Sequence, residues 1–204
     1  MRRNRMLKIG LTGGVGAGKS RLLTFIHEKY DAYVIQADKV GHILMEPGNA
    51  CYDQVTALFG PEIIKEDKTL DRRMISDVVF AEAEKLQQLN AIIHPAVKQY
   101  IRDALDREEA AGRSIAIVEA ALLLDDNYQD FLDEVWYVYT DEQVRIQRLM
   151  RDRGYSGEKA RSIMAAQKPD SWFRSHADFV IDNSGSPEEA EKQIMERLTE
   201  YEVL

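Results

Sequence analysis

One short stretch near the N-terminus constrains the fold more than any other part of the chain. The segment GLTGGVGAGKS, residues 10–20, contains the pattern GxxxxGKS at 13–20. This pattern is typical of the phosphate-binding loop of nucleoside triphosphate enzymes, where it joins a strand to a helix. Residues 8–12 read as a buried strand and residues 19–29 as a helix, so both flanking elements are expected.

The loop predicts a nucleotide-binding site. Its glycines let backbone N–H groups turn toward phosphate oxygens, and the N-terminus of the following helix adds positive potential. We expect Lys19 to reach the β- and γ-phosphates and Ser20 to coordinate Mg²⁺. The residues expected to bind the nucleotide here are Gly13, Gly14, Gly16, Ala17, Gly18, Lys19, Ser20 and Arg21.

Short apolar strands alternate with helices along the rest of the chain. Further strands are expected at 33–37, 114–118, 134–139 and 179–182. This alternation predicts an α/β fold with a parallel five-stranded sheet and helices on both faces. Polar patterns predict three helix starts: Thr140-x-x-Gln143 as a capping box, Ser156 as a cap, and Ser186-Pro187 before two glutamates. The first of these helices is expected to end near Asp152 and the second near Gln167.

The 204 residues are expected to form one domain with two helical insertions. The core would comprise about 7–38, 112–140 and 171–204. A mostly helical insertion would fill about 39–111, with Gly48, Gly60-Pro61 and His94-Pro95 as breaks. A helical lid would fill about 141–170. Both insertions exceed what a crossover needs, so we expect them to cover the site at the carboxyl ends of the strands.

Asp38 is expected to end the second strand, at the sheet edge that faces the ligand in such folds. A carboxylate there can orient or deprotonate a hydroxyl that attacks the γ-phosphate, or bind magnesium through water. It can also be a helix cap or a strand-end charge. Asp-x-x-Gly, a switch pattern of GTPases, occurs at 38–41 and 182–185. The guanine-reading Asn-Lys-x-Asp pattern is absent from the sequence, so we reject a GTPase switch.

Three arginines follow the strand at 134–139. At about 100° per residue, Arg145, Arg148 and Arg151 fall within about 120° of one helix. Arginines on a short helical lid can clamp a transferring phosphate and exclude water. The alternative is a solvated face that pairs with neighbouring acidic residues.

Three further polar residues have open roles. Glu119 follows the strand at 114–118, where an acidic residue often assists magnesium, but it can equally be a strand-end charge. His94 reads as a cap or turn residue after an apolar helix. Arg72, in LDRRM, reads as exposed and able to contact an anionic substrate.

Composition excludes several classes of function. A net charge of −8 makes the chain a poor candidate for wrapping a nucleic acid. No apolar run approaches the ~20 residues needed to cross a bilayer, and Arg2, Arg3 and Arg5 read as a short tail rather than a targeting signal. One cysteine, Cys51, excludes an internal disulfide. We expect a cytoplasmic protein with no nucleic acid, membrane or obligate protein partner.

Several segments together resemble the dephospho-CoA kinase family over nearly the full length. They are IGLTGGVGAGKS at 9–20, VIQADKVGHILMEPG at 34–48, LDRRMISDVVF at 70–80, LNAIIHPAV at 89–97, QVRIQRLMRDR at 143–153, AAQ at 165–167 and HADFVIDNSGS at 176–186. Their order and spacing carry the resemblance. It implies a P-loop kinase that transfers the γ-phosphate of ATP, with Mg²⁺, to the ribose 3′-hydroxyl of dephospho-CoA, the last step of coenzyme A synthesis.

The resemblance also implies roles for individual residues. These are Asp38 at the acceptor hydroxyl, Arg72 and His94 on the CoA side, Arg148 and Arg151 in the lid, and Asn183 in the loop beside the adenine. Two departures stand out. The family usually has Pro-Leu-Leu-Phe-Glu where this chain has ALLLD at 121–125, and often Thr where it has Arg21. The alternatives are another small kinase, such as a nucleoside monophosphate kinase, and a nucleotide switch or regulatory binding protein.

Overall fold

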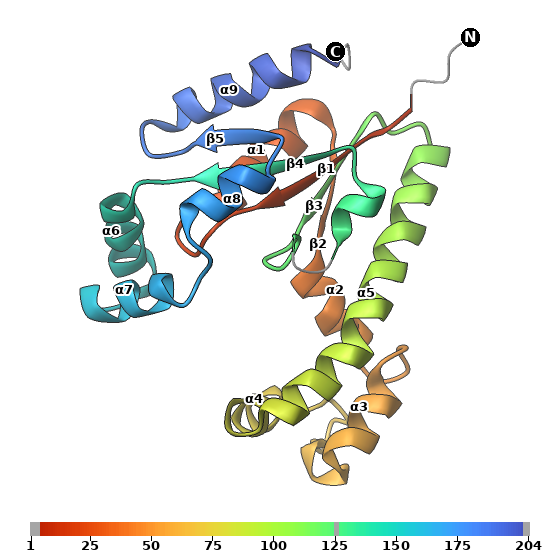
Figure 1. The fold of residues 1–204 in the computed structure, drawn as a ribbon. Helices are drawn as coiled ribbons and strands as arrows, with labels where there is room; N and C mark the ends of the chain where they lie inside the picture. The colour runs from red at the N-terminus through yellow and green to blue at the C-terminus, as the bar shows by residue number, and fades with distance from the viewer. Residues whose placement is uncertain (1–4, 125–126, 202–204) are drawn as a thin grey trace. The chain divides into compact units, whose positions relative to one another are not determined.

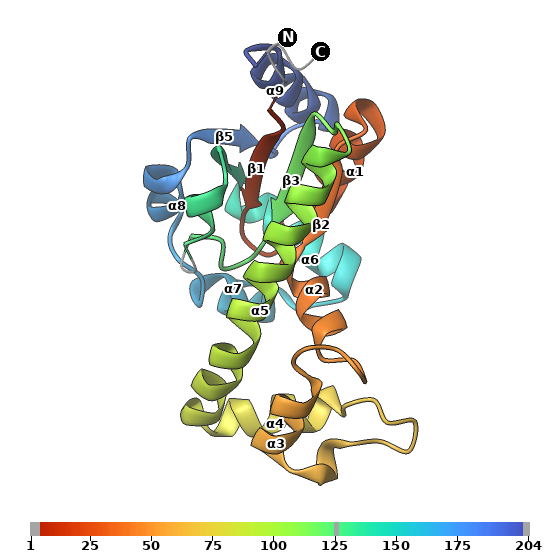
Figure 2. The ribbon, with the colours of Figure 1, turned by 90° about the vertical axis from the view of Figure 1, so that its right-hand side faces the viewer.

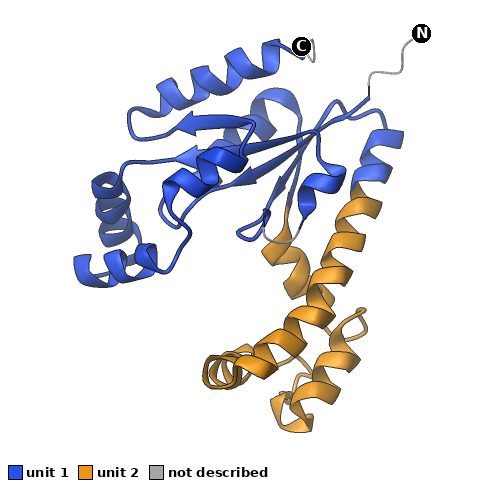
Figure 3. Cartoon of the chain, viewed as in Figure 1, with its two compact units in different colours: residues 1–35, 105–204 blue, residues 36–104 orange. Residues whose placement is uncertain are grey.

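The computed structural model describes residues 5–124 and 127–201, so Arg2, Arg3 and Asp125 lie outside the described residues. The chain forms two compact units (Figure 3). Unit 1 comprises residues 1–35 and 105–204, and unit 2 comprises residues 36–104.

Unit 1 is organised by a sheet in the order β2-β3-β1-β4-β5. The strands are β1 (Leu7–Thr12), β2 (Tyr33–Gln36), β3 (Ile115–Glu119), β4 (Glu134–Tyr139) and β5 (Phe179–Asp182). The central strand β1 is parallel to both of its neighbours, and Leu11 lies opposite Glu119 on one side and Trp136 on the other. The predicted five-stranded parallel sheet is therefore confirmed.

Helices cover both faces of this sheet. They are α1 (Lys19–Tyr30), α8 (Asp170–His176) and α9 (Pro187–Thr199). Helix α8 packs on β4, and α9 packs on β5 and α1. Two perpendicular views place α1 and α8 on opposite faces (Figure 1 and Figure 2). The buried core that they enclose includes Ile9, Leu11, Leu22, Ile26, Ile117, Trp136, Val138, Ile194 and Leu198. Burial on both faces explains why these strands are uniformly apolar.

Two more helices in unit 1 carry the predicted lid, α6 (Glu142–Arg153) and α7 (Gly157–Ala165). They enclose a small apolar cluster of Ile146, Leu149 and Ala160. Val15, from the loop after β1, packs against the same cluster. The lid helices are thus joined to the glycine-rich loop by apolar contact.

Helix caps confirm some predictions and correct others. Ser156 caps α7, and Ser186 forms the expected capping box at α9. The Thr140 capping box is wrong, because Asp141 is the N-cap of α6 and accepts hydrogen bonds from the backbone N–H groups of Gln143 and Val144. Helix α7 ends at Ala165, before Gln167, and the short helix α8 is an element that the sequence did not predict.

Unit 2 is mainly helical. Its elements are α2 (Ala37–Leu44), α3 (Tyr52–Phe59), the 3₁₀ turn η1 (Pro61–Ile63), α4 (Arg72–Ala81) and most of α5 (Ala83–Ala110). Unit 1 contains a second 3₁₀ turn, η2 (Tyr128–Phe131). No helix within the described ranges is long and apolar enough to cross a membrane.

Two local predictions in unit 2 are wrong. Strand β2 ends at Gln36, so Asp38 lies in the first turn of α2, where its charge complements the helix dipole. His94-Pro95 does not break the chain, because Pro95 lies inside the 28-residue helix α5. A proline there removes one helical hydrogen bond. Leu89 and Val97 are buried on either side of it, and this packing offsets the loss.

Candidate active site

The glycine-rich loop lies between β1 and α1, in the position that its pattern predicts. Gly16 and Gly18 have φ angles of 77° and 87°, in the left-handed region that favours glycine. Gly18 is the N-cap of α1, so the loop delivers its backbone directly to a helix N-terminus. That arrangement is suited to binding phosphate.

Lys19 curls back over the loop. Its Nζ donates a hydrogen bond to the carbonyl oxygen of Gly13 at 2.8 Å. The same Nζ lies 3.6 Å from Oε1 of Glu119, at the end of β3. Ser20 follows in the first turn of α1 and is exposed. The structure therefore brings Glu119, whose role the sequence left open, beside the lysine of the phosphate loop.

The carbonyl oxygen of Ala17 is a meeting point of three side chains. It accepts hydrogen bonds from Thr140 Oγ1 at 3.0 Å, Arg148 Nη1 at 3.4 Å and Asn183 Nδ2 at 2.7 Å. Thr140 and Asn183 are only 4% and 5% exposed. Arg148 also donates through Nη2 to the backbone oxygen of Asn183 at 2.9 Å. Burial lowers the pKa of Arg148 from its usual value, although an arginine keeps its charge at neutral pH.

Arg145 contacts the other side of the loop. Its Nε donates to the carbonyl oxygen of Val15 at 2.9 Å, and its Nη2 donates to Gln167 Oε1 at 2.7 Å. The backbone N–H of Val15 donates to the same Gln167 oxygen at 3.2 Å. Burial lowers the pKa of Arg145 as well. Both Nε and Nη2 of Arg145 therefore donate to other residues of the protein.

Arg151 and Arg21 behave differently from these two arginines. Arg151 has a 74% exposed side chain and pairs with Asp152 at 2.6 Å, and that hydrogen bond raises the pKa of Arg151. Arg21 is 60% exposed and lies 3.8 Å from Glu191. The predicted arginine group on α6 is therefore divided, with Arg145 and Arg148 against the loop and Arg151 paired in solvent.

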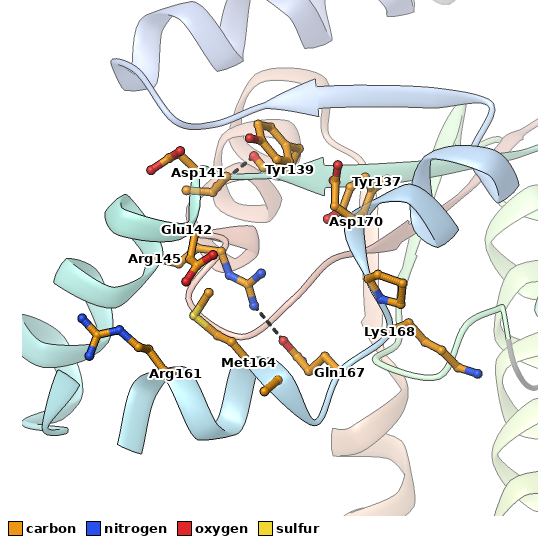
Figure 4. A pocket seen from close by; sticks show the side chains of 13 residues that line it. Tyr137, Tyr139, Asp141, Glu142, Arg145, Arg161, Met164, Gln167, Lys168 and Asp170 are labelled. Carbon is orange, nitrogen blue, oxygen red and sulfur yellow. Dashed lines mark hydrogen bonds between the residues drawn. The ribbon is translucent and has the colours of Figure 1, made fainter. Parts of the chain in front are cut away.

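A cavity of about 590 Å³ lies between β4 and the lid helices (Figure 4). It is lined by Tyr137, Tyr139, Thr140, Asp141, Glu142, Arg145, Arg161, Met164, Ala165, Gln167, Lys168, Pro169 and Asp170. Burial, with the negative charge of Asp170, raises the pKa of Tyr137 to about 12. The Arg145–Gln167 hydrogen bond crosses the cavity wall nearest the loop.

The other predicted site residues belong to unit 2. Asp38 is exposed on α2. Arg72 is exposed at the first position of α4, after the cap Asp71. His94 is half-buried within α5. Their roles toward the acceptor stay predictions.

Sequence reasoning misses two residues that hold the loop. The sequence predicts Thr140 as the cap of the next helix. It predicts Gln167 only as the end of a helix and as part of the segment AAQ, which resembles the dephospho-CoA kinase family. The detectable signal is their position: Thr140 directly follows β4, and Gln167 lies two residues after the end of α7.

Comparisons with known proteins decide the family. A family model described as dephospho-CoA kinase matches residues 7–189. The chain belongs to the dephospho-CoA kinase family. A dephospho-CoA kinase of Shouchella clausii is 35% identical over 94% of this chain and 97% of its own length. A dephospho-CoA kinase of Geobacillus kaustophilus is 34% identical over 97% of this chain and 98% of its own.

Solved structures agree on the fold. A Thermus thermophilus protein superposes with a TM-score of 0.80 at 28% identity, over 96% of this chain and 98% of its own. Dephospho-CoA kinase from Campylobacter jejuni superposes with a TM-score of 0.71 at 22% identity, over 95% of this chain and 96% of its own. A shikimate kinase from Acinetobacter baumannii superposes with a TM-score of 0.53 at 15% identity, over 97% of this chain and 96% of its own. The fold is that of P-loop kinases, as predicted, and the protein is an ATP-dependent phosphotransferase.

Proposed function

We propose that this protein transfers the γ-phosphate of ATP to the ribose 3′-hydroxyl of dephospho-CoA. The observation that carries the proposal is the GxxxxGKS loop held between β1 and α1, in a chain that the family model covers from residue 7 to 189. We further propose that it acts in the cytoplasm, without a nucleic acid, membrane or obligate protein partner. The net charge of −8 and the single cysteine support this.

The loop residues bind and orient the nucleotide. In this proposal Lys19 Nζ leaves the Gly13 carbonyl and moves to the β- and γ-phosphate oxygens, a short movement because it already lies over the loop. Backbone N–H groups of the loop at the N-terminus of α1 would bind the phosphate oxygens, whereas the Val15 N–H is already bonded to Gln167. Glu119 restrains Lys19 until the phosphates arrive.

We propose that magnesium binds at the same corner of the molecule. Kinase Mg²⁺ needs few protein ligands, because waters and phosphate oxygens complete its octahedron. Ser20 would hold the ion, with Glu119 nearby. When bound, Mg²⁺ neutralises charge on the β- and γ-phosphates.

The remaining residues act on the acceptor and the transferring group. Asp38 is proposed to align the 3′-hydroxyl and accept its proton, and Arg72 and His94 to bind the CoA side. Arg148 and Arg151 are proposed to stabilise charge on the γ-phosphate when the lid closes, which also excludes water. Asn183 is proposed to lie beside the adenine.

A coupled assay for ADP release tests the proposal. Release should be strongly stimulated by dephospho-CoA and weakly or not at all by AMP or CMP. Phosphorus NMR should locate the new phosphate at the 3′ position. Stimulation by AMP with phosphorylation of its 5′-phosphate would instead identify a nucleotide kinase. ADP release that ignores every acceptor would refute both.

A further inference from the structure

The outer side of the phosphate loop is held by a triangle of hydrogen bonds. Both polar groups of the Val15 backbone take part: its N–H donates to Gln167 and its carbonyl oxygen accepts from Arg145. The Arg145–Gln167 hydrogen bond, 2.7 Å long, closes the triangle. The loop segment is therefore bound at two adjacent polar groups by two side chains that also bind each other.

The chemistry of the two side chains suits this task. A guanidinium presents its N–H donors in one rigid plane, so Nε and Nη2 can address two acceptors at once. The amide oxygen of a glutamine has two lone pairs, so it can accept from both Val15 and Arg145. Arg145 is half-buried, so lost hydrogen bonds there are not simply replaced by water. A lysine, with its compact ammonium, does not reproduce the two-acceptor geometry.

Gly14 gives independent support. A Cβ built on Gly14 would lie 2.3 Å from Nη2 of Arg145 and 2.9 Å from Oε1 of Gln167. The pair therefore sits directly on the Gly14 backbone. A side chain at this position would displace the guanidinium, so the pair accounts for the absence of a side chain at Gly14.

The pair also connects the loop to both ends of the lid. Arg145 lies in the first turns of α6, and Gln167 follows α7 (Figure 4). The Val15 side chain packs into the apolar cluster that α6 and α7 share. Polar and apolar contacts thus converge on one loop residue from both lid helices.

We propose that Arg145 and Gln167 are positioning residues that hold the phosphate loop in its nucleotide-binding shape and tie it to the lid. This rests on the proposed function, but it concerns how the nucleotide is bound rather than which acceptor is phosphorylated. It assigns Arg145 to the loop rather than to the transferring phosphate, in contrast to Arg148 and Arg151.

The test measures ADP affinity by titration calorimetry, which requires no phosphate transfer. Gln167→Leu removes the shared acceptor and should weaken ADP binding by roughly tenfold. Gln167→Glu keeps an acceptor oxygen and should bind within about threefold of the parent. Arg145→Leu should weaken ADP binding as much as Gln167→Leu does. Because the two residues act as a unit, the ADP affinity of the double variant should lie within about threefold of that of the weaker-binding single variant.

A matched control is Lys159→Leu. It removes an exposed cation of α7 that lies over the Tyr155 ring and does not line the cavity, so ADP affinity should be unchanged. The kinetic readout should be a raised KM for ATP, with kcat at saturating ATP and KM for dephospho-CoA within about threefold of the parent. Failure of the parent itself to bind ADP would refute the proposed function rather than the pair.

Three results would overturn the inference. Normal ADP affinity with reduced kcat in Arg145→Leu would place this residue at the transferring phosphate. If Gln167→Leu and Gln167→Glu lose the same amount of ADP affinity and the same amount of melting temperature, the pair is only structural. If Gln167→Leu does not fold, Gly14→Ala replaces it, since its methyl group displaces the guanidinium. Additive effects of Gly14→Ala and Arg145→Leu would show that the glycine and the pair act separately.

Discussion

Replacing Glu134 by glutamine should destabilise the fold without touching the nucleotide site. Glu134 begins β4 and is 7% exposed. Its carboxylate accepts hydrogen bonds from Trp136 Nε1 at 2.6 Å, from the Arg197 guanidinium and from the Tyr201 hydroxyl. Burial alone would raise the pKa of Glu134, but these donors outweigh it and leave the pKa below its usual range.

The magnitude follows from what the Glu134→Gln substitution removes: the side chain keeps its shape but loses the charge that pairs with Arg197. Hydrogen bonds to charged groups contribute about 1.5–3 kcal/mol each, and breaking a buried ion pair costs about 3–5 kcal/mol. Because one acceptor oxygen remains, we expect a loss of about 2–4 kcal/mol. For a chain of this size that lowers the melting temperature by roughly 5–15 °C.

The assay is thermal melting followed by circular dichroism from pH 7 to pH 3, with Glu200→Gln as the control. Glu200 pairs with the same arginine but its side chain is 62% exposed, so its loss should cost less than about 1 kcal/mol. A depressed folded-state pKa gives stability that is present above the unfolded value of about 4.3 and is lost as the pH falls through the folded value. The difference in melting temperature between the parent and Glu134→Gln should therefore be constant from about pH 7 to pH 5 and should become smaller below pH 5. Equal melting temperatures for the two variants at pH 7 would refute the reasoning.

Three further predictions concern phosphate transfer. Lys19→Ala should lower kcat by at least about 10²-fold with an unchanged melting temperature, and a loss under about tenfold in the coupled assay would exclude the loop as the site. Asp38→Asn should lower transfer by roughly 10²-fold while ATP affinity, measured by calorimetry, stays near the parent value; rescue by added magnesium would make Asp38 a metal ligand instead. Arg148→Ala and Arg151→Ala should each reduce kcat by more than they weaken dephospho-CoA binding, and parallel losses would place them in ordinary substrate binding.

Much of the sheet could be predicted from the sequence, because its strands are buried on both faces. Glu134–Tyr139 and Phe179–Asp182 occur where their apolar runs predict them. The phosphate loop could be predicted because its pattern fixes both local backbone and chemistry. Ser186 could be predicted as a cap because its partner, Glu189, lies only three residues away.

What could not be predicted depends on partners distant in the sequence. The Thr140 hydroxyl can cap a helix locally, but here it binds Ala17, 123 residues away. The helical spacing of Arg145, Arg148 and Arg151 placed them on one face, yet it carries no information about which acceptor each one reaches. Pro95 would break an isolated helix, whereas here α5 stays continuous and its residues Leu89 and Val97 are buried.

The three donors on the Ala17 carbonyl have an electronic consequence. That oxygen and the Gly18 N–H belong to one peptide group, so hydrogen bonds accepted at the oxygen draw electron density out of the amide. The Gly18 N–H becomes more acidic and a stronger donor, at the N-cap of α1 where we predict that a phosphate oxygen binds. We therefore expect Thr140, Arg148 and Asn183 to strengthen anion binding at Gly18 through the shared peptide group, an effect separate from the direct contact proposed for Arg148 when the lid closes.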